Sequence, residues 1–353
     1  MFGFSKSKNV VGLDIGSSAI KLIELKEKKG GTYSLVKLGI ERLSPEAIVD
    51  GSIMDSSMVV ETISKLNSEK GVKNSNYATS LSGHSVIIKK ISLPAMSPEE
   101  LSESIQWEAE QYIPFDINDV NLDYVPLASA GTGDNIEVIL VAVKKEKIND
   151  YTSVISQTGK VAMLVDVDAF ALQNCYEMNN DVDEDKVLAL VNIGASVTNV
   201  NVLSGSNSVF WRDITFGGNQ YTDAIQRELS LSFEQAEELK RGRPQGDYTI
   251  QQVIPILNSV SEDFAGELRK TLDFFTATSG AERVDEIVLA GGGSGVLNLD
   301  AILRDKFGMP VTILDPFRRV TVDEGEFNPE ELAEIAPSMA IAVGLAIRKL
   351  GDA

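Results

Sequence analysis

The chain alternates short apolar runs with small polar turns, and one such unit occurs twice. Residues Val10–Leu25 read VVGLDIGSSAIKLIEL and residues Leu188–Leu203 read LALVNIGASVTNVNVL, so the copies start 178 residues apart (188 minus 10). In each copy an apolar run leads to one polar residue, Ile-Gly and two small residues, and a second apolar run follows. Aliphatic and β-branched runs around a small-residue turn predict two β-hairpins.

The turns of these hairpins carry no large side chain that would cover their backbone N–H groups. They are Gly16-Ser17-Ser18 and Gly194-Ala195-Ser196, and Asp14 and Asn192 precede them at the ends of the first strands. Uncovered N–H groups can approach phosphate oxygens closely. One such turn is common in α/β domains, but the duplication predicts a two-lobed cleft around a polyphosphate.

The segment between the hairpins changes character along its length. A strand is predicted at Tyr33–Arg42, and a helix at Met58–Leu66 behind the capping cluster Asp55-Ser56-Ser57. From residue 77 to 161 the pattern reads strand, helix, polar stretch, strand and helix, which indicates a compact inserted subdomain of β-α-β-β-α type.

The first helix of this insertion has a clear start and an apolar end. Ser97, Pro98 and Glu100 form a capping-box pattern that predicts a helix beginning at Pro98. The helix runs into several large apolar side chains, which are candidates for a partner site: Trp107, Tyr112, Ile113, Pro114 and Phe115. Burial in the subdomain's own core is an equally good interpretation of these residues.

Asp168 stands just before an apolar helix predicted at 169–176. An acidic residue at this position is typically an N-cap, and the alternative role is to orient a water molecule. Further on, Ser232 and Gln235 form another capping box, which starts a short helix that carries Glu237 and Lys240. In isolation this E-x-x-K spacing is most often a solvent-exposed ion pair.

A strand predicted at Asp285–Ala290 is followed by the glycine loop Gly291-Gly292-Gly293-Ser294-Gly295 and a helix at Val296–Phe307. Strand, glycine loop and helix favour a nucleotide site, because bare backbone meets a flat ring or a phosphate. The loop has neither G-x-G-x-x-G spacing nor a P-loop lysine, which argues against the Rossmann and Walker classes.

Composition narrows the chemistry. The 353 residues are 43% hydrophobic and 24% charged, and no apolar run approaches the roughly 20 residues of a membrane span. Residues 1–8 lack the apolar core of a secretory signal, so a cytoplasmic protein is expected. His84 and Cys175 are the only residues of their kinds, which excludes a disulfide framework and His-dependent triads. The formal charge of −20 opposes binding to nucleic acid.

Four stretches together resemble the actin, Hsp70 and sugar kinase superfamily, in that superfamily's order. They are GLDIGSSAIKL (Gly12–Leu22), VNIGASVTNV (Val191–Val200), VLAGGGSGV (Val288–Val296) and SMAIAVGLAI (Ser338–Ile347). Within the superfamily, the insertion and the run QWEAEQYIPFDINDVNLDY (Gln106–Tyr124) resemble the PilM family of type IV pilus assembly proteins, which are similar to the division protein FtsA.

The resemblance implies an α/β, two-lobed actin-like fold, a duplicated ribonuclease H-like unit with an FtsA-type inserted subdomain in the first lobe. The implied divisions are a first lobe at 1–76 and 162–186, an insertion at 77–161, a second lobe at 187–336 with a subdomain at about 219–280, and a C-terminal helix at 337–353 that returns to the first lobe.

The resemblance also implies ATP and Mg²⁺ as cofactors. Asp14 would hold Mg²⁺ through water. The residues expected to bind ATP are Asp14, Gly16, Ser17, Ser18, Lys21, Asn192, Gly194, Ala195, Ser196, Glu237, Lys240, Gly291, Gly292, Gly293 and Ser294.

One residue departs from the enzymes of the superfamily, which usually carry a carboxylate where this chain has Asn192. An amide cannot take a proton from attacking water, so ATP binding with weak or absent hydrolysis is expected, unless Asp168 points into the cleft. The alternatives are a sugar or metabolite kinase and an FtsA-like filament protein. Tethering by the chain's own tail is not expected, because Ala353 directly follows an apolar helical segment.

The partner implied by the resemblance is the cytoplasmic N-terminal tail of PilN, bound in a seam between the first lobe and the insertion. PilN would recruit the protein to the cytoplasmic face of the inner membrane and link it indirectly to the pilus motor ATPases and the platform protein. Type II secretion platforms use similar actin-like domains, so the assignment to the type IV pilus pathway also rests on the resemblance.

Overall fold

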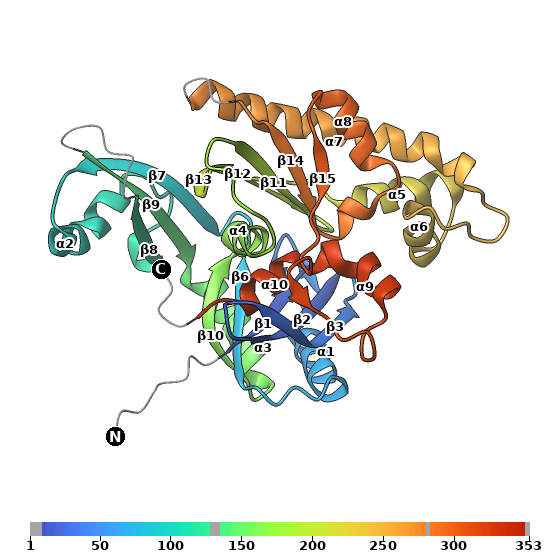
Figure 1. Ribbon diagram of the computed structural model, residues 1–353, viewed down its shortest axis with the longest axis horizontal. Coiled ribbons are helices and arrows are strands. Elements are labelled where there is room, and N and C mark those ends of the chain that lie inside the picture. Colours follow the sequence, from blue (N-terminus) through green and yellow to red (C-terminus); the bar gives the residue numbers. More distant parts are fainter. Residues whose placement is uncertain (1–8, 128–134, 280–282, 350–353) are drawn as a thin grey trace.

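The computed structural model describes residues 9–127, 135–279 and 283–349. It consists of two lobes stacked one above the other, with a smaller sheet set to one side (Figure 1). The segment 1–8 and the last residues of the predicted C-terminal helix lie outside the described residues. None of the helices in the described ranges combines the length and apolarity that crossing a membrane requires.

The first lobe is built on a six-stranded sheet of order β10-β6-β1-β2-β3-β16. Strands β1, β2 and β3 form an antiparallel meander, and β6 and β10 continue parallel to β1. The strands are β1 Val11–Ile15, β2 Ala19–Glu27, β3 Tyr33–Arg42, β6 Asn76–Leu81, β10 Val161–Val167 and β16 Val320–Thr321. A small hairpin, β4 Ile48–Val49 with β5 Ser52–Ile53, precedes the first helix.

The second lobe repeats this arrangement in a five-stranded sheet of order β13-β12-β11-β14-β15. Again three antiparallel strands are followed by two parallel ones. The strands are β11 Val187–Ile193, β12 Thr198–Ser204, β13 Asn207–Ile214, β14 Glu286–Ala290 and β15 Val311–Ile313. The repeated order of strands confirms the duplicated, two-lobed α/β fold.

Helices pack on the sheets of both lobes. Those of the first lobe and its connections are α1 Ser56–Glu69, α3 Lys145–Gln157, α4 Asp168–Asn179, α9 Pro329–Ile335 and α10 Ala340–Ala346. Those of the second lobe are α5 Gly218–Leu229, α6 Phe233–Lys240, α7 Ile250–Thr278 and α8 Leu299–Phe307. Helix α7 was not predicted, although Thr249 and Gln252 provide its capping box and a stripe of buried residues runs along it.

The inserted unit is a three-stranded antiparallel sheet of order β7-β9-β8 with α2 against it. Its elements are β7 Val86–Pro94, α2 Pro98–Ala109, the short 3-10 turn 117–119, β8 Val120–Leu127 and β9 Asn135–Lys144. The predicted bounds of 77 to 161 also include β6 and α3. These two elements pack with the first lobe, because β6 is a strand of its sheet and Tyr151, Val154 and Ile155 of α3 belong to its core.

Local signals at helix starts are mostly confirmed. Ser97 caps α2 with Glu100 completing the capping box, Asp55 caps α1, and Ser232 and Gln235 cap α6. The N-cap interpretation of Asp168 is wrong. Asp168 is the first residue of α4, and its side chain makes no capping hydrogen bond because it accepts one from Ser80 on β6 instead.

Two helices meet between the lobes with almost no side chains separating them. A Cβ added at Gly344 of α10 would lie 1.8 Å from the carbonyl oxygen of Ala171 in α4. A Cβ added at Gly12 of β1 would lie 2.0 Å from the carbonyl oxygen of Ala342. In the described residues, the C-terminal helix predicted at 337–353 is a 3-10 turn at 336–339 followed by α10, which packs backbone against backbone between β1 and α4.

Candidate functional site

The two predicted hairpins face each other across the space between the lobes. In the first, the Gly16 N–H donates to the carbonyl of Ala19 at 3.1 Å; in the second, the Gly194 N–H donates to the carbonyl of Val197 at 3.0 Å. The hydroxyls of Ser17 and Ser196 lie 3.3 Å apart, which brings one turn from each lobe into direct contact. The backbone of both turns thus converges on one site, as their duplication predicts.

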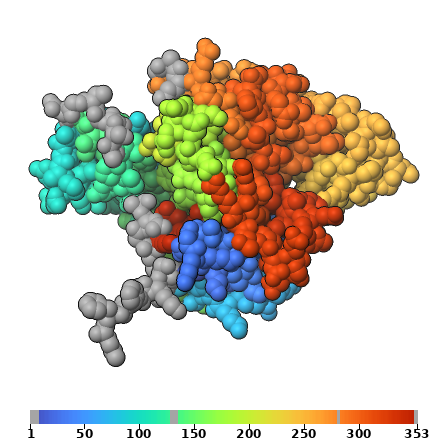
Figure 2. Space-filling model, viewed as in Figure 1, coloured from blue at the N-terminus to red at the C-terminus, as the bar shows by residue number. Residues whose placement is uncertain are grey.

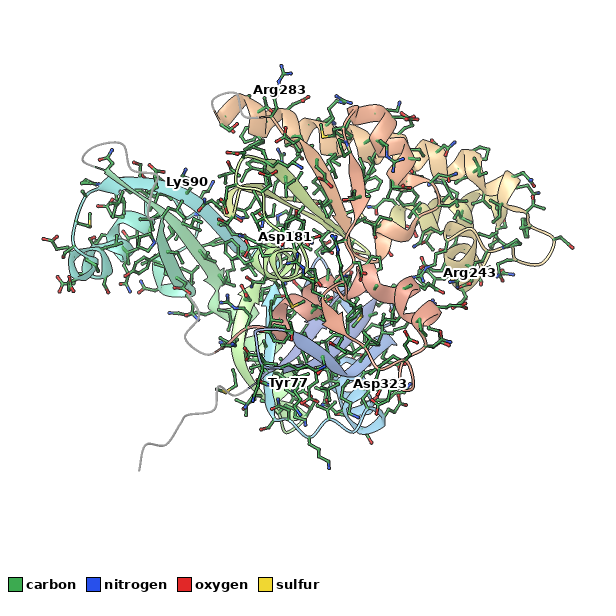
Figure 3. The ribbon with its side chains drawn as sticks, viewed as in Figure 1. Tyr77, Lys90, Asp181, Arg243, Arg283 and Asp323 are labelled. Atoms are coloured by element: carbon green, nitrogen blue, oxygen red, sulfur yellow. The ribbon has the colours of Figure 1, made fainter. Side chains whose placement is uncertain are left out.

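A cleft cavity of about 280 Å³ opens beside these turns. Figure 2 shows the second lobe above the first, and Figure 3 labels Arg243, one of the second-lobe residues that line the cavity. The predicted residues that line it are Ser17, Ser18, Lys21, Gly194, Ala195, Glu237, Lys240, Gly291, Gly292 and Gly293. Three elements far apart in the sequence, the two hairpins and the glycine loop, therefore share one cavity.

Asp14 and Lys21 form the charged pair of the first hairpin. They are cross-strand neighbours on β1 and β2, and Lys21 Nζ donates to Asp14 Oδ2 at 2.7 Å. Both side chains are mostly buried, with 14% exposure for Asp14 and 15% for Lys21. A cation held at the mouth of a turn whose N–H groups are bare can neutralise an anion there, and Asp14 can in turn hold a hydrated cation.

Asn192 occupies the equivalent position in the second hairpin and is held by a different contact. Its cross-strand neighbour is Asn199, whose Oδ1 accepts a hydrogen bond from Asn192 Nδ2 at 3.0 Å. Asn192 does not line the cavity; its Oδ1 lies behind the glycine loop, 2.6 Å from where a Cβ on Gly291 would be. The amide therefore packs against the loop rather than facing the cleft.

The glycine loop offers bare backbone to the cavity at one point in particular. A Cβ on Gly292 would have nothing closer than Ser338 at 3.9 Å, so the space in front of it is open. Gly291 has φ of +83°, a conformation that favours glycine. The predicted helix at Val296–Phe307 starts later, because a 3-10 turn at 292–295 comes first and α8 begins only at Leu299.

Ser294 has a structural place in this loop. It is buried and donates its hydroxyl to the Gly291 carbonyl at 2.7 Å, so its side chain holds the loop closed and does not line the cavity. Asp14, Gly16 and Ser196 also lie outside the cavity lining, although all three belong to the hairpins whose turns border it.

Glu237 and Lys240 form a buried pair on α6. Lys240 Nζ donates to Glu237, and also to Thr222 Oγ1 at 2.9 Å and the Gly218 carbonyl at 3.2 Å. Burial raises the pKa of Glu237, but Lys240 and the Thr222 hydroxyl outweigh it and leave the pKa below its ordinary value. The exposed-pair interpretation of this E-x-x-K motif is therefore wrong, and its charged heads border the cleft.

Asp168 belongs to the first lobe near Asp14 and does not line the cleft cavity. Its Oδ1 accepts from the Ser80 hydroxyl at 2.6 Å. Burial, and then the Asp14 carboxylate, raise the pKa of Asp168 to about 6. A carboxyl group with this pKa can take up or release a proton near neutral pH, which is what a water-orienting base requires.

No group of three or more acidic, cysteine or histidine side chains in the described ranges is arranged to hold a metal ion. Asp14 alone therefore cannot supply a complete site. A cation at Asp14 would need oxygen ligands from water and from a bound anion, which suits Mg²⁺ because it keeps several waters when bound.

A separate groove of about 860 Å³ lies between the inserted sheet and the first lobe. Its walls come from β8 and β9 on one side, from β10 and α4 on the other, and from the β12–β13 turn. In the described sheets β8 and β10 are both edge strands, so each leaves backbone groups without a strand partner beside the groove. A buried ion pair, Asp166 with Arg348 at 3.2 Å, lies among the lining residues.

None of the five residues predicted to line this seam does so. Trp107 is 74% exposed and Tyr112 40% exposed on the surface of the insertion, while Ile113 is buried in its core. Phe115 packs against that core with Lys144 Nζ 4.4 Å from its ring centroid, and Pro114 is exposed. The lining residues on β8, such as Tyr124 and Val125, were missed because they follow a polar stretch with weak alternation.

Comparison with known proteins agrees with this architecture. A family model described as type IV pilus assembly protein PilM matches residues 12–350. A structure of the PilM-PilN type IV pilus biogenesis complex is 31% identical, covering 97% of this chain and 99% of that chain with a TM-score of 0.86.

More distant structures share the fold. The ethanolamine utilization protein EutJ from Carboxydothermus hydrogenoformans is 13% identical, with a TM-score of 0.59 over 96% of this chain and 89% of that one. MreB5 of Spiroplasma citri bound to ADP is 12% identical, with a TM-score of 0.53 over 96% and 95%. The family match spans both lobes and the insertion, and the chain therefore belongs to the PilM family of type IV pilus assembly proteins.

Proposed function

We propose that this protein is an adaptor that binds Mg-ATP between its lobes and a peptide segment of PilN in the groove beside the insertion. The observation that carries the proposal is the pair of sites. One site is a cleft with two small-residue turns and the positively charged side chain of Lys21. The other is a groove bordered by two edge strands. The family match does not favour a kinase or a filament protein.

The residues around the cleft fit an adenine nucleotide with Mg²⁺. Lys21 offers positive charge to phosphates, and the N–H groups that follow Gly16 and Gly194 in the two turns would donate to them, while Asp14 would hold the hydrated metal. Gly292 leaves open backbone where a flat ring can approach, and Glu237 and Lys240 border the same cavity. MreB5, which shares the fold, was solved with ADP. Bound Mg²⁺ would supply charge neutralisation for the phosphates.

The cleft fits nucleotide binding better than rapid hydrolysis. Asn192 has no carboxylate and points its amide toward Asn199, away from the cavity. Asp168 is the remaining acid near Asp14, and it is engaged with Ser80. We expect ATP turnover below about 1 per second, at the slow end of enzymes, and a steady-state phosphate-release assay measures it.

The groove fits an extended peptide that adds to an exposed sheet edge. Main-chain groups of β8 and β10 can pair with a strand, and apolar side chains such as Val125 and Phe170 can pack on alternate residues of it. The PilM-PilN complex among the structural relatives supports PilN as the source of the peptide. Binding to this inner-membrane protein would hold the adaptor at the cytoplasmic face of the membrane.

Calorimetry with a synthetic peptide of the PilN cytoplasmic segment tests the groove. Val125→Asp places a charge on the groove wall at a side chain that is 38% exposed, so the fold should persist. We expect peptide affinity to fall tenfold or more, while ATP affinity stays within twofold.

Two control variants lie outside the groove. Trp107→Ala changes the most exposed aromatic side chain of the insertion, and Phe115→Ala changes its core. Neither should weaken peptide binding more than about threefold, although Phe115→Ala should lower the stability of the insertion. If both controls lose the peptide and Val125→Asp keeps it, the peptide binds on α2 and the proposed site is wrong.

A further inference from the structure

A line of polar side chains leads from the second hairpin to the base of the inserted sheet. Asn192 Nδ2 donates to Asn199 Oδ1 at 3.0 Å, and Asn199 Nδ2 donates to Asp213 Oδ1 at 2.8 Å. The second oxygen of Asp213 accepts from the backbone N–H of Gly83 at 2.7 Å. Three side chains of the second lobe thus connect to a backbone group of the first.

This relay, Asn192–Asn199–Asp213–Gly83, has a direction. Each amide donates to the next oxygen, and the carboxylate of Asp213 accepts at both of its oxygens. A carboxylate at position 192 has no proton to donate, so it would force Asn199 to turn and present its own oxygen to Asp213. The relay therefore gives a physical reason for an amide at 192, where related enzymes carry an acid.

The relay runs from behind the nucleotide cleft to the base of the insertion, and neither of its ends lines a cavity. Asn192 packs behind Gly291, whose loop lines the nucleotide cleft. Gly83 belongs to the connection between β6, a first-lobe strand, and β7, the first strand of the inserted sheet. A shift of the second hairpin against the glycine loop would therefore pull on the segment from which the insertion begins.

The strand that carries Asp213 also forms part of the groove. Asn207 and Ser208 at the opposite end of β13 line it. There the Ser208 hydroxyl donates to Gln173 Oε1 of α4 at 2.7 Å, and Gln173 Nε2 donates to the Ser206 carbonyl at 2.9 Å. Strand β13 is thus bonded across the lobe boundary at both ends, once to the base of the insertion and once to the groove wall.

We infer that Asn199 and Asp213 are positioning residues that make the peptide affinity of the groove depend on whether the cleft holds nucleotide. The inference rests on the proposed function and adds the regulation of its two sites. Asp213 is exposed, so its bonds to Asn199 and Gly83 form and break easily. A coupling of about fivefold to tenfold between the two ligands corresponds to such contacts.

The experiment measures peptide affinity by calorimetry on the full chain, with and without saturating Mg-AMPPNP, which avoids turnover. For the unmodified protein we expect the nucleotide to change the dissociation constant of the PilN peptide by about fivefold or more. Asp213→Ala should reduce that change to less than twofold, while each ligand alone binds within about threefold of the unmodified protein. Asp223→Ala, at another exposed acid of the second lobe, is the matched control and should keep the full coupling.

Hydrogen exchange of backbone amides provides a second measurement, made at the relay itself. Nucleotide should slow exchange in the segment 82–85 of the unmodified protein and of Asp223→Ala, because the Gly83 N–H is bonded across the lobes. In Asp213→Ala the nucleotide should leave exchange in this segment unchanged.

The outcomes separate the inference from the function on which it rests. Binding of both ligands without mutual influence would overturn the relay and leave the adaptor function standing. Full coupling in Asp213→Ala would overturn it as well, since the contact would then be dispensable. If the unmodified protein binds neither ligand, both the function and the inference fail.

Discussion

Hairpins β1–β2 and β11–β12 place similar turns on opposite sides of the cleft, yet the cross-strand pair just before each turn differs in charge. In the first hairpin the pair is Asp14 with Lys21, and in the second, 178 residues later (192 minus 14), it is Asn192 with Asn199. The first pair is an ion pair at 2.7 Å, and the second is an amide pair at 3.0 Å.

Because the two pairs differ in charge, we expect the two hairpins to have different roles. The first hairpin carries charged groups that a hydrated metal and phosphates would use in the proposed function, and the second carries neutral groups that hydrogen-bond to Asp213. The turns are alike, and this pair places opposite charges on one side of the cleft and neutral amides on the other.

The largest expected effect comes from removing charge on the first side. Asp14→Ala should lower Mg-ATP affinity by about a hundredfold or more, because the metal loses its carboxylate and Lys21 loses its partner. Asn192→Ala should cost less than tenfold in the same calorimetric titration. Equal losses in the two variants would mean that the hairpins contribute alike, and the division of tasks would be wrong.

Making the second side resemble the first should have a smaller effect. Asn192→Asp places a carboxylate in the buried amide pair, where it has no proton to donate to Asn199 Oδ1. We expect the free energy of unfolding, measured with denaturant, to fall by about 2 kcal/mol, because a charge is buried without a compensating donor. Asn192→Ala is the control and should lose less, since it buries no charge. Unchanged stability in the Asp variant would show that residue 192 is not confined behind the glycine loop.

The smallest expected effect is a pH dependence on the acidic side. The pKa of Asp168 is raised from 3.8 to about 6 in the folded protein. The native state therefore binds a proton that the unfolded chain releases between those values, and this stabilisation is lost as pH rises from about 4 to 6.

Asp168→Asn removes this titration. Relative to the unmodified protein, its free energy of unfolding should rise by on the order of 1 kcal/mol between pH 5 and 7.5. Denaturant unfolding at the two pH values provides the measurement. A constant difference would mean that the pKa of Asp168 lies outside this range.

Much of the fold could be predicted because the responsible signals are local. The repeated hairpins, the capping box at Ser97 and the strand at Tyr33–Arg42 each depend on a few adjacent residues, and the structure has them where they were expected. The buried ion pair of Glu237 and Lys240 was not foreseeable, since an E-x-x-K spacing looks the same whether its helix faces solvent or a neighbouring helix.

The groove was harder to predict because its lining depends on how sheets are arranged. The large apolar residues that follow α2 made Phe115 a candidate, but its side chain packs against the insertion's core. The groove instead uses edge strands that only the strand order reveals, and β8 gives little sign of this in its residues. The same limit applies to Asp168, whose bond to Ser80 joins positions 88 residues apart.

The close contact of α10 with α4 and β1 has a consequence for how such a molecule can move. Where main chains touch at Gly344 and Gly12, there are no long side chains that could exchange one interlocked arrangement for another, so the two helices cannot slide past each other in steps. The contact between α10 and α4 can therefore serve as an axis of rotation. We expect an opening of the lobes to be a rotation about this line, in which points far from it, such as the mouth of the cleft and the outer end of β13, travel farthest for the same turn.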